Sequence, residues 1–387
     1  MRLLLSKLVG ISLLSAASFS TAAQIDVMTQ NHYLGTDLAP VLNAATADPF
    51  DPVAFNAAVV DALTRIAGTR PAERARALAA GIAQRKPDVV GLQEAMKLEC
   101  MPYPGVPSQP GMGCDDPAVK AAFTDRLEDT VLALRGKYIV AGKVTTSQFP
   151  VIPFFVNGYP ARLALADRDA ILVREDLPAS WVNFASLGAC PKPSDEGCNY
   201  LTAPPPASTP VGTLAIERGF LAVDVMVKGQ EYRVFNTHLE QRLLAPNMPE
   251  TRLLQVGQAI ELLTITLLEP GKTVVVIGDF NSDPRDTIPS PPVATPYMLF
   301  TWSGFTDSWM QRPHEENGLT CCQSEDLTNR RSALYERVDM IFSLTPPSHV
   351  LDMRLLGDTM GDKTRPPGNG GLWPSDHAAL AAKLKFD

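Results

Sequence analysis

The sequence lacks the short motifs that identify several large enzyme classes. It contains no G-x-G-x-x-G stretch, no G-x-x-x-x-G-K-[ST] loop, no G-x-S-x-G elbow and no H-E-x-x-H pair. The first two motifs are glycine-rich loops whose backbone binds phosphate groups. The third presents a nucleophilic serine, and the fourth binds a zinc ion. Their absence argues against dehydrogenases, P-loop nucleotide hydrolases, α/β-hydrolases and zincins.

The chain also has little excess of positive charge and few histidines. Its formal net charge is -8, and it contains five histidines. This balance argues against binding nucleic acid through a broad basic surface, although a bound metal and a local basic patch would still permit a nuclease. No cysteines have the spacing of a metal site, so oxygen ligands are the better candidates for any metal.

Long hydrophobic runs are missing after the N-terminus. Residues 1–23 combine Arg2 and Lys7 with a short apolar core and small residues that end at Ala23. This pattern is typical of a cleaved signal peptide and predicts a secreted or periplasmic protein. An N-terminal membrane anchor is the alternative, but the core is short and interrupted for a membrane span. No later segment predicts a transmembrane segment.

Six cysteines are present, and an even number in an exported chain favours disulfides. The simplest pairing is local, Cys100 with Cys114 and Cys190 with Cys198, because each pair brackets a loop. Cys321 and Cys322 are adjacent, so a bond between them is conceivable but strained. The sequence alone leaves other connectivities open.

The 387 residues show no repeats and no linker between regions of different composition. We therefore expect residues 24–387 to form a single domain with loop insertions. Apolar residues recur at helical spacing over residues 52–85, with a break at Pro71, and helix signals return over 123–132 and 248–268. Strands are expected between them, including a hairpin around the turn at Lys228-Gly229-Gln230.

The most informative stretch is residues 273–283. An apolar, mostly β-branched run ends at Gly278, and Asp279 and Asn281 follow it directly. Such a run predicts a buried strand, and the residues just past a rigid strand are well placed to carry chemistry. Five further predicted strand ends or starts carry similar polar residues: Asn31, Glu94, His238, Asp339, Asp376 and His377.

Together these eight side chains could perform phosphate-ester hydrolysis. Oxygen ligands suit Mg²⁺, with Mn²⁺ or Ca²⁺ as alternatives. A metal neutralises phosphoryl oxygens, a carboxylate activates water, and a histidine transfers a proton. The opposing hypothesis is that these are unrelated turn residues with no common site. Their distances in the structure decide between the two.

Five motifs occur in a characteristic order: Gln93-Glu94, Asn236-Thr237-His238-Leu239, Gly278-Asp279-Phe280-Asn281, Arg337-Val338-Asp339 and Ser375-Asp376-His377. In this order the chain resembles a secreted bacterial member of the endonuclease/exonuclease/phosphatase superfamily. The resemblance extends from Asn31 to the C-terminus. It implies an α/β (α+β) fold, a four-layer αββα sandwich of two mostly antiparallel sheets flanked by helices.

The resemblance also implies a divalent metal and its ligands. Glu94 matches the main metal ligand of the superfamily, and Asn31 lies beside it. Asp376 would help to bind a metal or would stabilise the site. The expected cofactor is Mg²⁺, with Mn²⁺ or Ca²⁺ as alternatives.

The remaining matched positions are catalytic in the superfamily. By resemblance, Asp279 orients or activates water, and Asn281 contacts the phosphate. Asp339 holds the imidazole of His377, which acts as a general base or as an electrostatic stabiliser. His238 hydrogen-bonds the scissile phosphate or serves as general acid.

The implied activity is a metal-dependent phosphodiesterase with a phospholipid head group or nucleic acid as substrate. The stretch Asn236-Thr237-His238-Leu239 is similar to the sphingomyelinase, inositol-phosphatase and secreted-deoxyribonuclease branches. The stretch Asn31-His32-Tyr33-Leu34 is more similar to the sphingomyelinase pattern, although no clear membrane-inserting hairpin is found. The apolar residues 149–156 form either a core-packed loop or an exposed loop that makes peripheral membrane contact. A phosphomonoesterase and a non-catalytic binding module are the alternative functions.

Overall fold

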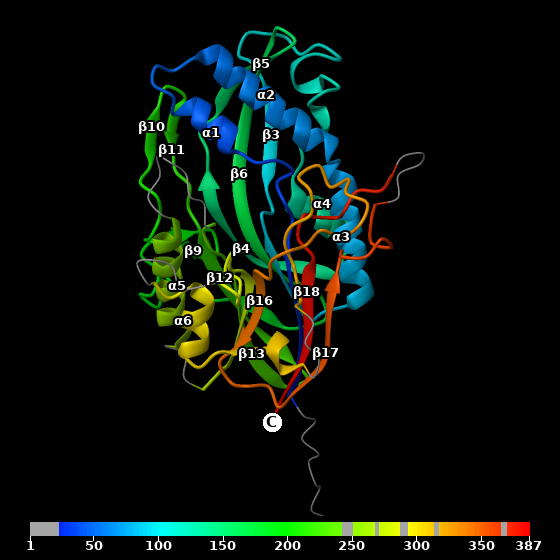
Figure 1. Ribbon diagram of the computed structural model, residues 1–387, viewed down its shortest axis with the longest axis vertical. Helices are drawn as coiled ribbons and strands as arrows, with labels where there is room; N and C mark the ends of the chain where they lie inside the picture. Colours follow the sequence, from blue (N-terminus) through cyan, green and yellow to red (C-terminus); the bar gives the residue numbers. More distant parts are fainter. Residues whose placement is uncertain (1–22, 242–250, 268–270, 287–292, 313–316, 365–369) are drawn as a thin grey trace, which may run out of the picture.

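Two eight-stranded sheets face each other, and helices cover their outer faces (Figure 1). The computed structural model describes residues 23–241, 251–267, 271–286, 293–312, 317–364 and 370–387. Helices α3 and α4 pack on one sheet and α5 and α6 on the other. The α/β fold predicted from the sequence is therefore confirmed, with helices outside two stacked sheets. The helices are α1 (Ala39–Ala45), α2 (Pro52–Gly68), α3 (Pro71–Arg85), α4 (Arg126–Ala133), α5 (Thr251–Leu267) and α6 (Pro296–Trp302).

The first sheet, sheet A, has the order β17-β18-β1-β2-β6-β3, and β4 and β5 also pair with β6. All of its pairs are antiparallel except β1 with β2. Its strands are β1 (Ala23–Asn31), β2 (Val89–Gln93), β3 (Lys97–Pro102), β4 (Tyr138–Gln148), β5 (Ile152–Val156), β6 (Tyr159–Arg174), β17 (His349–Leu356) and β18 (Ala379–Phe386).

The second sheet, sheet B, has the order β15-β16-β14-β13-β12-β9-β8, and β7 pairs with β12. Its only parallel pair among the described residues is β13 with β14. Its strands are β7 (Ala179–Trp181), β8 (Pro193–Ser194), β9 (Gly197–Asn199), β12 (Gly219–Val227), β13 (Gln230–His238), β14 (Thr273–Asp279), β15 (Thr306–Asp307) and β16 (Asp339–Ser343). A separate hairpin pairs β10 (Ala207–Thr209) with β11 (Gly212–Leu214).

The core between the sheets consists of β-branched and aliphatic side chains. Val27, Val223, Val275, Ile277 and Ile341 are all fully buried there. Strands that bury both faces lose the alternation of polar and apolar residues, which explains the continuous apolar run of β14. This packed layer gives the strand ends a rigid support.

The predicted helices form where the apolar spacing indicates. Asp51 caps α2 by accepting hydrogen bonds from the backbone of Val53 and Ala54, and Pro52 occupies the first turn. Pro71 then begins α3, as the expected break requires. The helix predicted over 123–132 is α4, and the one over 248–268 is α5, whose predicted ends lie partly outside the described residues.

One prediction of secondary structure is wrong. Residues 149–156 were expected to be a loop, but Ile152–Val156 is strand β5, paired with β6. Because side chains alternate along a strand, Phe154 is buried whereas Phe155 is 50% exposed. The predicted hairpin at residues 228–230 is confirmed between β12 and β13.

Disulfides join Cys100 to Cys114, Cys190 to Cys198 and Cys321 to Cys322. No helix among the described residues is long and apolar enough to cross a bilayer. The predicted signal peptide lies outside the described residues except for Ala23.

Candidate active site

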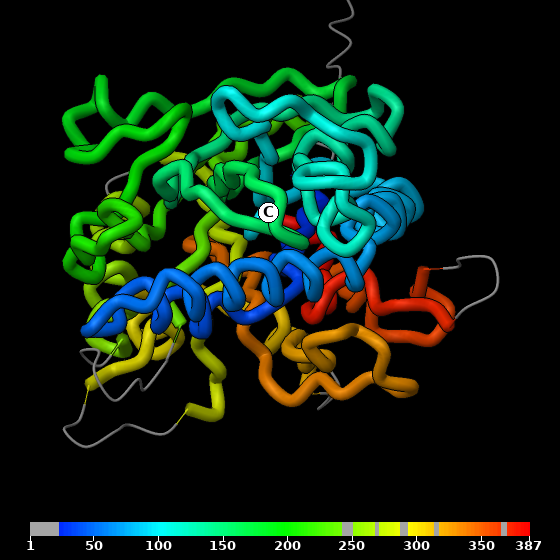
Figure 2. The backbone as a smooth tube through the Cα atoms, turned by 90° about the horizontal axis from the view of Figure 1, so that it is seen from above, coloured from blue at the N-terminus to red at the C-terminus, as the bar shows by residue number. Residues whose placement is uncertain are grey.

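Strand register brings the predicted residues of both sheets to one end of the sandwich. In sheet A, Asn31 ends β1 and pairs with Gln93 at the end of β2, directly before Glu94. In sheet B, Asp279 ends β14 and lies opposite His238 on β13 and Asp339 on β16. Seen from above, α1 and α2 cross this end of the molecule (Figure 2).

The Asn31 side chain joins the two sheets. Its Nδ2 donates to Glu94 Oε1 at 3.2 Å and to Asp279 Oδ2 at 3.1 Å. Its Oδ1 accepts from the backbone N–H of Tyr33 at 2.8 Å, and Glu94 Oε2 accepts from the N–H of Leu34 at 2.8 Å. A carboxylate from each sheet is therefore held by a single amide.

The backbone at the site adopts uncommon conformations. Glu94 and Asn281 have φ of 51° and 47°, in the left-handed region that non-glycine residues rarely occupy. Asn281 thereby turns its N–H to Asp279 Oδ1, at 2.9 Å. Gly278 has φ of 150°, and an added Cβ there would lie 2.1 Å from the carbonyl oxygen of Thr237. Such strain concentrates at functional sites, where the surrounding structure imposes it.

His377 and Asp339 form a buried pair that spans the sheets. His377 Nδ1 lies 2.8 Å from Asp339 Oδ2, and His377 Nε2 lies 3.8 Å from Asp279 Oδ2. Ser375 fixes the approach to β18, because its hydroxyl donates to the carbonyl of Asn31 at 2.7 Å and accepts from the N–H of His377 at 3.1 Å. Nε2 is the ring atom left to face the site.

His238 is fixed from both sides. Arg218 Nη1 lies 3.0 Å from His238 Nδ1, and Asn281 Nδ2 lies 3.1 Å from Nε2. A guanidinium can only donate, so Nδ1 must accept and the proton of the neutral ring belongs on Nε2. The amide nitrogen of Asn281 is also a donor, so its approach to Nε2 is a close contact and not a hydrogen bond. Asp279 Oδ2, 3.6 Å from Nε2, is the nearby carboxylate oxygen that faces this proton.

The two imidazoles have opposite electrostatic environments. Burial opposes the charged form of His377, but the charges of Asp339, Asp376 and Asp279 outweigh it and raise its pKa well above the usual value. Burial lowers the pKa of His238 well below the usual value, and the positive charge of Arg218 adds to this shift. The first ring is held charged and the second neutral.

Two of the acidic groups have raised pKa values. Burial raises the pKa of Asp279 to about 7, the charge of Asp339 acts in the same direction, and His377 opposes it. Burial also raises the pKa of Asp376 to about 6, with a further contribution from the charge of Glu94. A carboxylate with a pKa near neutrality can accept a proton under ordinary conditions.

The donor set fits a hard divalent cation. Glu94 and Asp376 are half-buried acids whose mutual repulsion a cation would relieve. Asp279, Asp339 and His377 also lie close enough together to hold an ion. Asn31 turns its nitrogen, not its oxygen, toward the carboxylates, so in this arrangement it links the acids. The metal role of Asn31 stays a prediction.

Arg218, which contacts His238, did not stand out in the sequence. Its guanidinium also lies 3.6 Å from Asp167 and 3.2 Å from Glu240. Asp167 and Asp169 are buried on β6, and neither oxygen of Asp169 has a hydrogen-bond partner among the described residues. The signal available was a pair of acids that flank Arg168 within a largely apolar strand.

Asn236, a residue of one of the five motifs, forms a second polar link between the sheets. It is fully buried, and its Nδ2 donates to the carbonyls of Leu92 and Ala170 at 3.0 and 3.1 Å. A Cβ on Gly91 would lie 2.5 Å from Asn236 Oδ1. The glycine therefore lets the sheets approach closely beside the site.

A solved structure from Bacteroides thetaiotaomicron agrees with this architecture. The structure of this chain is similar to that of the Bacteroides protein, an endonuclease/exonuclease/phosphatase family protein, with 17% sequence identity and a TM-score of 0.52. The match covers 95% of this chain and 99% of that one. The chain is also similar to a family protein from Leptotrichia buccalis (13%, 0.47, 94% and 100%) and to a humanized TDP2 of D. rerio (17%, 0.45, 93% and 98%).

No curated protein matches the chain. The model of the endonuclease/exonuclease/phosphatase family, by contrast, matches residues 53–377, which include all the site residues described above except Asn31. The resemblance inferred from the five motifs is thus confirmed at the level of the family. The chain belongs to the endonuclease/exonuclease/phosphatase family, whose members are metal-dependent hydrolases of phosphate esters.

Proposed function

We propose that this protein is a Mg²⁺-dependent phosphodiesterase that uses the site described above. The observation that carries the proposal is the chain of contacts from Glu94 through Asn31 to Asp279, with the His377–Asp339 pair beside it. Five strands and the segments that flank them converge to make it. Unrelated turn residues would not share such contacts across two sheets.

Glu94 and Asp376 would hold the cation, with Asn31 beside them. Mg²⁺ is the proposed ion, and Mn²⁺ or Ca²⁺ would satisfy the same oxygen ligands. When bound, the ion would neutralise phosphoryl oxygens and stabilise the oxygen that leaves.

Asp279 is the proposed acceptor of the water proton. Its Oδ1 is held by the N–H of Asn281, and its Oδ2 faces both imidazoles. As water attacks phosphorus, the carboxylate takes the proton, which its raised pKa favours. Asp339 fixes the charged ring of His377, whose Nε2–H then stabilises the negative charge that develops on the phosphoryl group. This favours electrostatic stabilisation over general-base catalysis for His377.

His238 and Asn281 are the proposed phosphate contacts. His238 is neutral and carries its proton on Nε2, so it offers a hydrogen bond to a phosphoryl oxygen. The Asn281 amide is oriented by its bond to the carbonyl of Leu239 at 2.9 Å. Of the two roles implied by resemblance for His238, the hydrogen-bond donor is the one that its environment favours.

We further propose that residues 24–387 act as one catalytic domain and that the chain is exported after cleavage of residues 1–23. Three disulfides are compatible with an oxidising compartment. N-terminal sequencing of the protein recovered outside its host cell tests both the export and the cleavage of residues 1–23. An intact N-terminus on cell-bound protein would contradict this proposal.

The deciding experiment offers two substrate classes to the purified mature chain, with Mg²⁺ and with EDTA. Sphingomyelin vesicles are assayed for phosphocholine, and plasmid and single-stranded DNA are assayed for cleavage. We expect hydrolysis that EDTA abolishes. Cleavage of 4-nitrophenyl phosphate, a phosphomonoester offered in parallel, without cleavage of either diester would replace the proposed function with a phosphatase, and no hydrolysis of any substrate would leave a binding module.

A further inference from the structure

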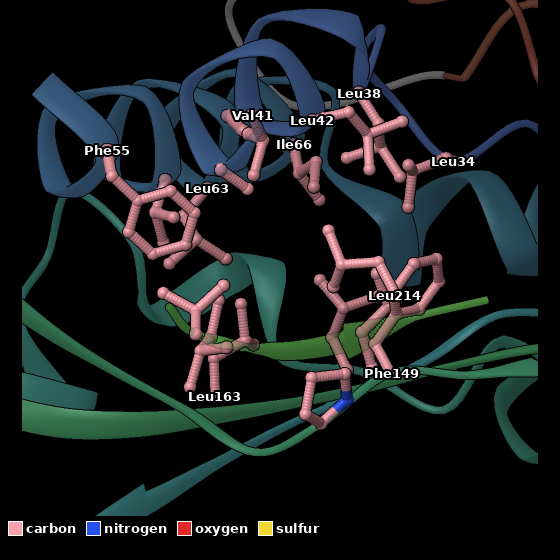
Figure 3. Close-up of a pocket in the computed structure, with 18 residues that line it drawn as sticks. Leu34, Leu38, Val41, Leu42, Phe55, Leu63, Ile66, Phe149, Leu163 and Leu214 are labelled. Atoms are coloured by element: carbon pink, nitrogen blue, oxygen red, sulfur yellow. The ribbon is translucent and has the colours of Figure 1, made fainter. Parts of the chain in front are cut away.

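An apolar pocket lies beneath α1 and α2 (Figure 3), and its lining residue Leu34 also contacts Glu94 of the candidate active site. The two helices form its roof, strands β5 and β6 form part of its floor, and the β10–β11 hairpin closes one side. Its volume is about 70 Å³, several times the space that one water molecule needs. All 18 residues that line it are apolar.

We propose that this pocket binds one alkyl chain of a lipid phosphodiester, and that the substrate of the adjacent site is therefore a lipid and not a nucleic acid. The inference rests on the proposed function, since it assumes that the site hydrolyses phosphodiesters. Three features of the pocket carry it: its connection to the site, its chemistry and its outer rim.

The connection runs through Leu34. The backbone N–H of Leu34 donates to Glu94 Oε2 at 2.8 Å, while its side chain lines the pocket (Figure 3). The guanidinium of Arg126 donates to the carbonyls of Tyr33 and Leu34 and fixes this segment. The pocket and the proposed cation site therefore adjoin at Leu34.

The chemistry of the wall suits a hydrocarbon. A nucleobase carries donors and acceptors that need partners when they leave water, and these side chains offer none. An alkyl chain needs only apolar contact and gains affinity with each buried methylene. Leu38 directly before α1, Leu63 on α2 and Leu163 on β6 face the cavity from opposite sides (Figure 3).

The outer rim exposes apolar side chains where a lipid surface would lie. Val53, Val151 and Phe155 are 76%, 48% and 50% exposed. Asn56 joins α2 to β5 at this rim, because its side chain exchanges hydrogen bonds of 3.0 and 2.6 Å with the backbone of Phe155. Exposed apolar patches mark surfaces that contact membranes, ligands or other proteins, and this rim borders a pocket that suits a hydrocarbon.

The apolar residues 149–156 explain both features. Phe149, Pro150 and Ile152 line the pocket, whereas Val151 and Phe155 face solvent. The hairpin residue Gly212 packs so closely on Pro150 that an added Cβ would lie 3.0 Å from its ring. The same stretch thus forms one wall of the pocket and part of its exposed rim.

The test is a series of alkylphosphocholines, which are phosphodiesters with one chain, assayed below their micelle concentrations with Mg²⁺. We expect kcat/KM to rise at least about tenfold from short to long chains, because each added methylene is buried. Each value is expressed relative to hydrolysis of bis(4-nitrophenyl) phosphate, which has no alkyl chain.

Ala62→Leu fills the pocket from α2 and is expected to abolish the dependence on chain length. Val41→Ala enlarges the pocket from α1 and should shift the preference to longer chains, which keeps the test informative if the first variant does not fold. Ala80→Leu is the matched control, since Ala80 is an exposed α3 residue in a separate cleft. This variant should show the wild-type dependence of kcat/KM on chain length.

Binding is measured separately in EDTA, by titrating dodecylphosphocholine into the wild type and Ala62→Leu. Tighter binding to the wild type supports the pocket even if no phosphodiester is hydrolysed, in which case only the proposed function fails. Hydrolysis of bis(4-nitrophenyl) phosphate with no effect of chain length, or hydrolysis of DNA alone, would overturn the lipid inference and leave the proposed function standing.

Discussion

The two sheets supply the candidate site with different kinds of side chain. Sheet A presents Glu94 and Asp376, which are half-buried. Sheet B presents His238, Asp279 and Asp339, which are at most 1% exposed and lie in a dense hydrogen-bonded network. We therefore expect the sheet A residues to bind the cation, and the sheet B residues to transfer protons and to hydrogen-bond the substrate.

The largest effect is expected where the sheets meet, at the His377–Asp339 pair. His377→Ala should lower kcat about 10²- to 10⁴-fold without changing the Mg²⁺ concentration at half-maximal rate, because the ring acts on the phosphoryl group and does not hold the ion. Steady-state kinetics over a Mg²⁺ titration measure both quantities.

A double variant sharpens this test. If Asp339 acts through His377, His377→Ala combined with Asp339→Asn should be no worse than His377→Ala alone. Asp352→Asn on the outer strand β17 is the matched control and should have wild-type kinetics. Losses that multiply would show that Asp339 acts independently.

The next largest effect is expected on sheet A. Glu94→Gln removes a negative charge from the proposed cation site, so the Mg²⁺ concentration needed for half-maximal rate should rise at least about 10- to 100-fold. Direct Mg²⁺ binding by calorimetry gives a readout that does not depend on turnover. Glu99→Gln, at an exposed position on β3, serves as the control. An unchanged Mg²⁺ requirement would contradict the proposal that sheet A binds the cation.

A smaller effect is expected from Arg218, the cation beside His238. Arg218→Met removes a charge that lowers the pKa of His238, so that pKa should rise toward its usual value. We expect kcat to fall about tenfold, because one charge-assisted hydrogen bond to the ring is lost. NMR titration of the His238 ring measures the pKa. A fall in kcat without a rise in this pKa would assign Arg218 a purely structural role.

The smallest effect concerns stability and pH. Burial raises the pKa of Asp169 well above its usual value, so its contribution to folding stability is present at low pH and is lost as the pH rises through the folded-state pKa. Asp169→Asn should therefore gain about 1 kcal/mol over the wild type at alkaline pH and nothing at acidic pH. Urea unfolding at both pH values measures the difference.

Asp224 on sheet B gives the opposite sign. Burial alone would raise its pKa, but hydrogen bonds from Arg233 and Lys272 lower it below its usual value. Its contribution is present above the unfolded-state pKa and is lost as the pH falls through the folded-state pKa. Asp224→Asn should be destabilised at neutral pH and close to wild type at low pH. The same pH response for both variants would contradict these charge assignments.

The helices and the catalytic motifs could be predicted from the sequence because their signals are local. Helical spacing gave α2, and Pro71 marked the break before α3. Residues 149–156 were less predictable, because a short apolar run with prolines does not reveal whether a neighbouring strand will pair with it. The same limit applies to Arg218, whose importance depends on a contact with a ring 20 positions away.

The sequence by itself determined the family and the set of polar strand ends, since both are written in short segments with fixed spacing. The tertiary structure decided how these ends combine. Only the packing of two sheets brings Asn31 within 3.1 Å of Asp279, 248 positions later, and holds His238 neutral while His377 is charged. The apolar pocket likewise exists only after folding, because its walls come from six separate elements and the loops between them, and no local pattern records the space that they enclose.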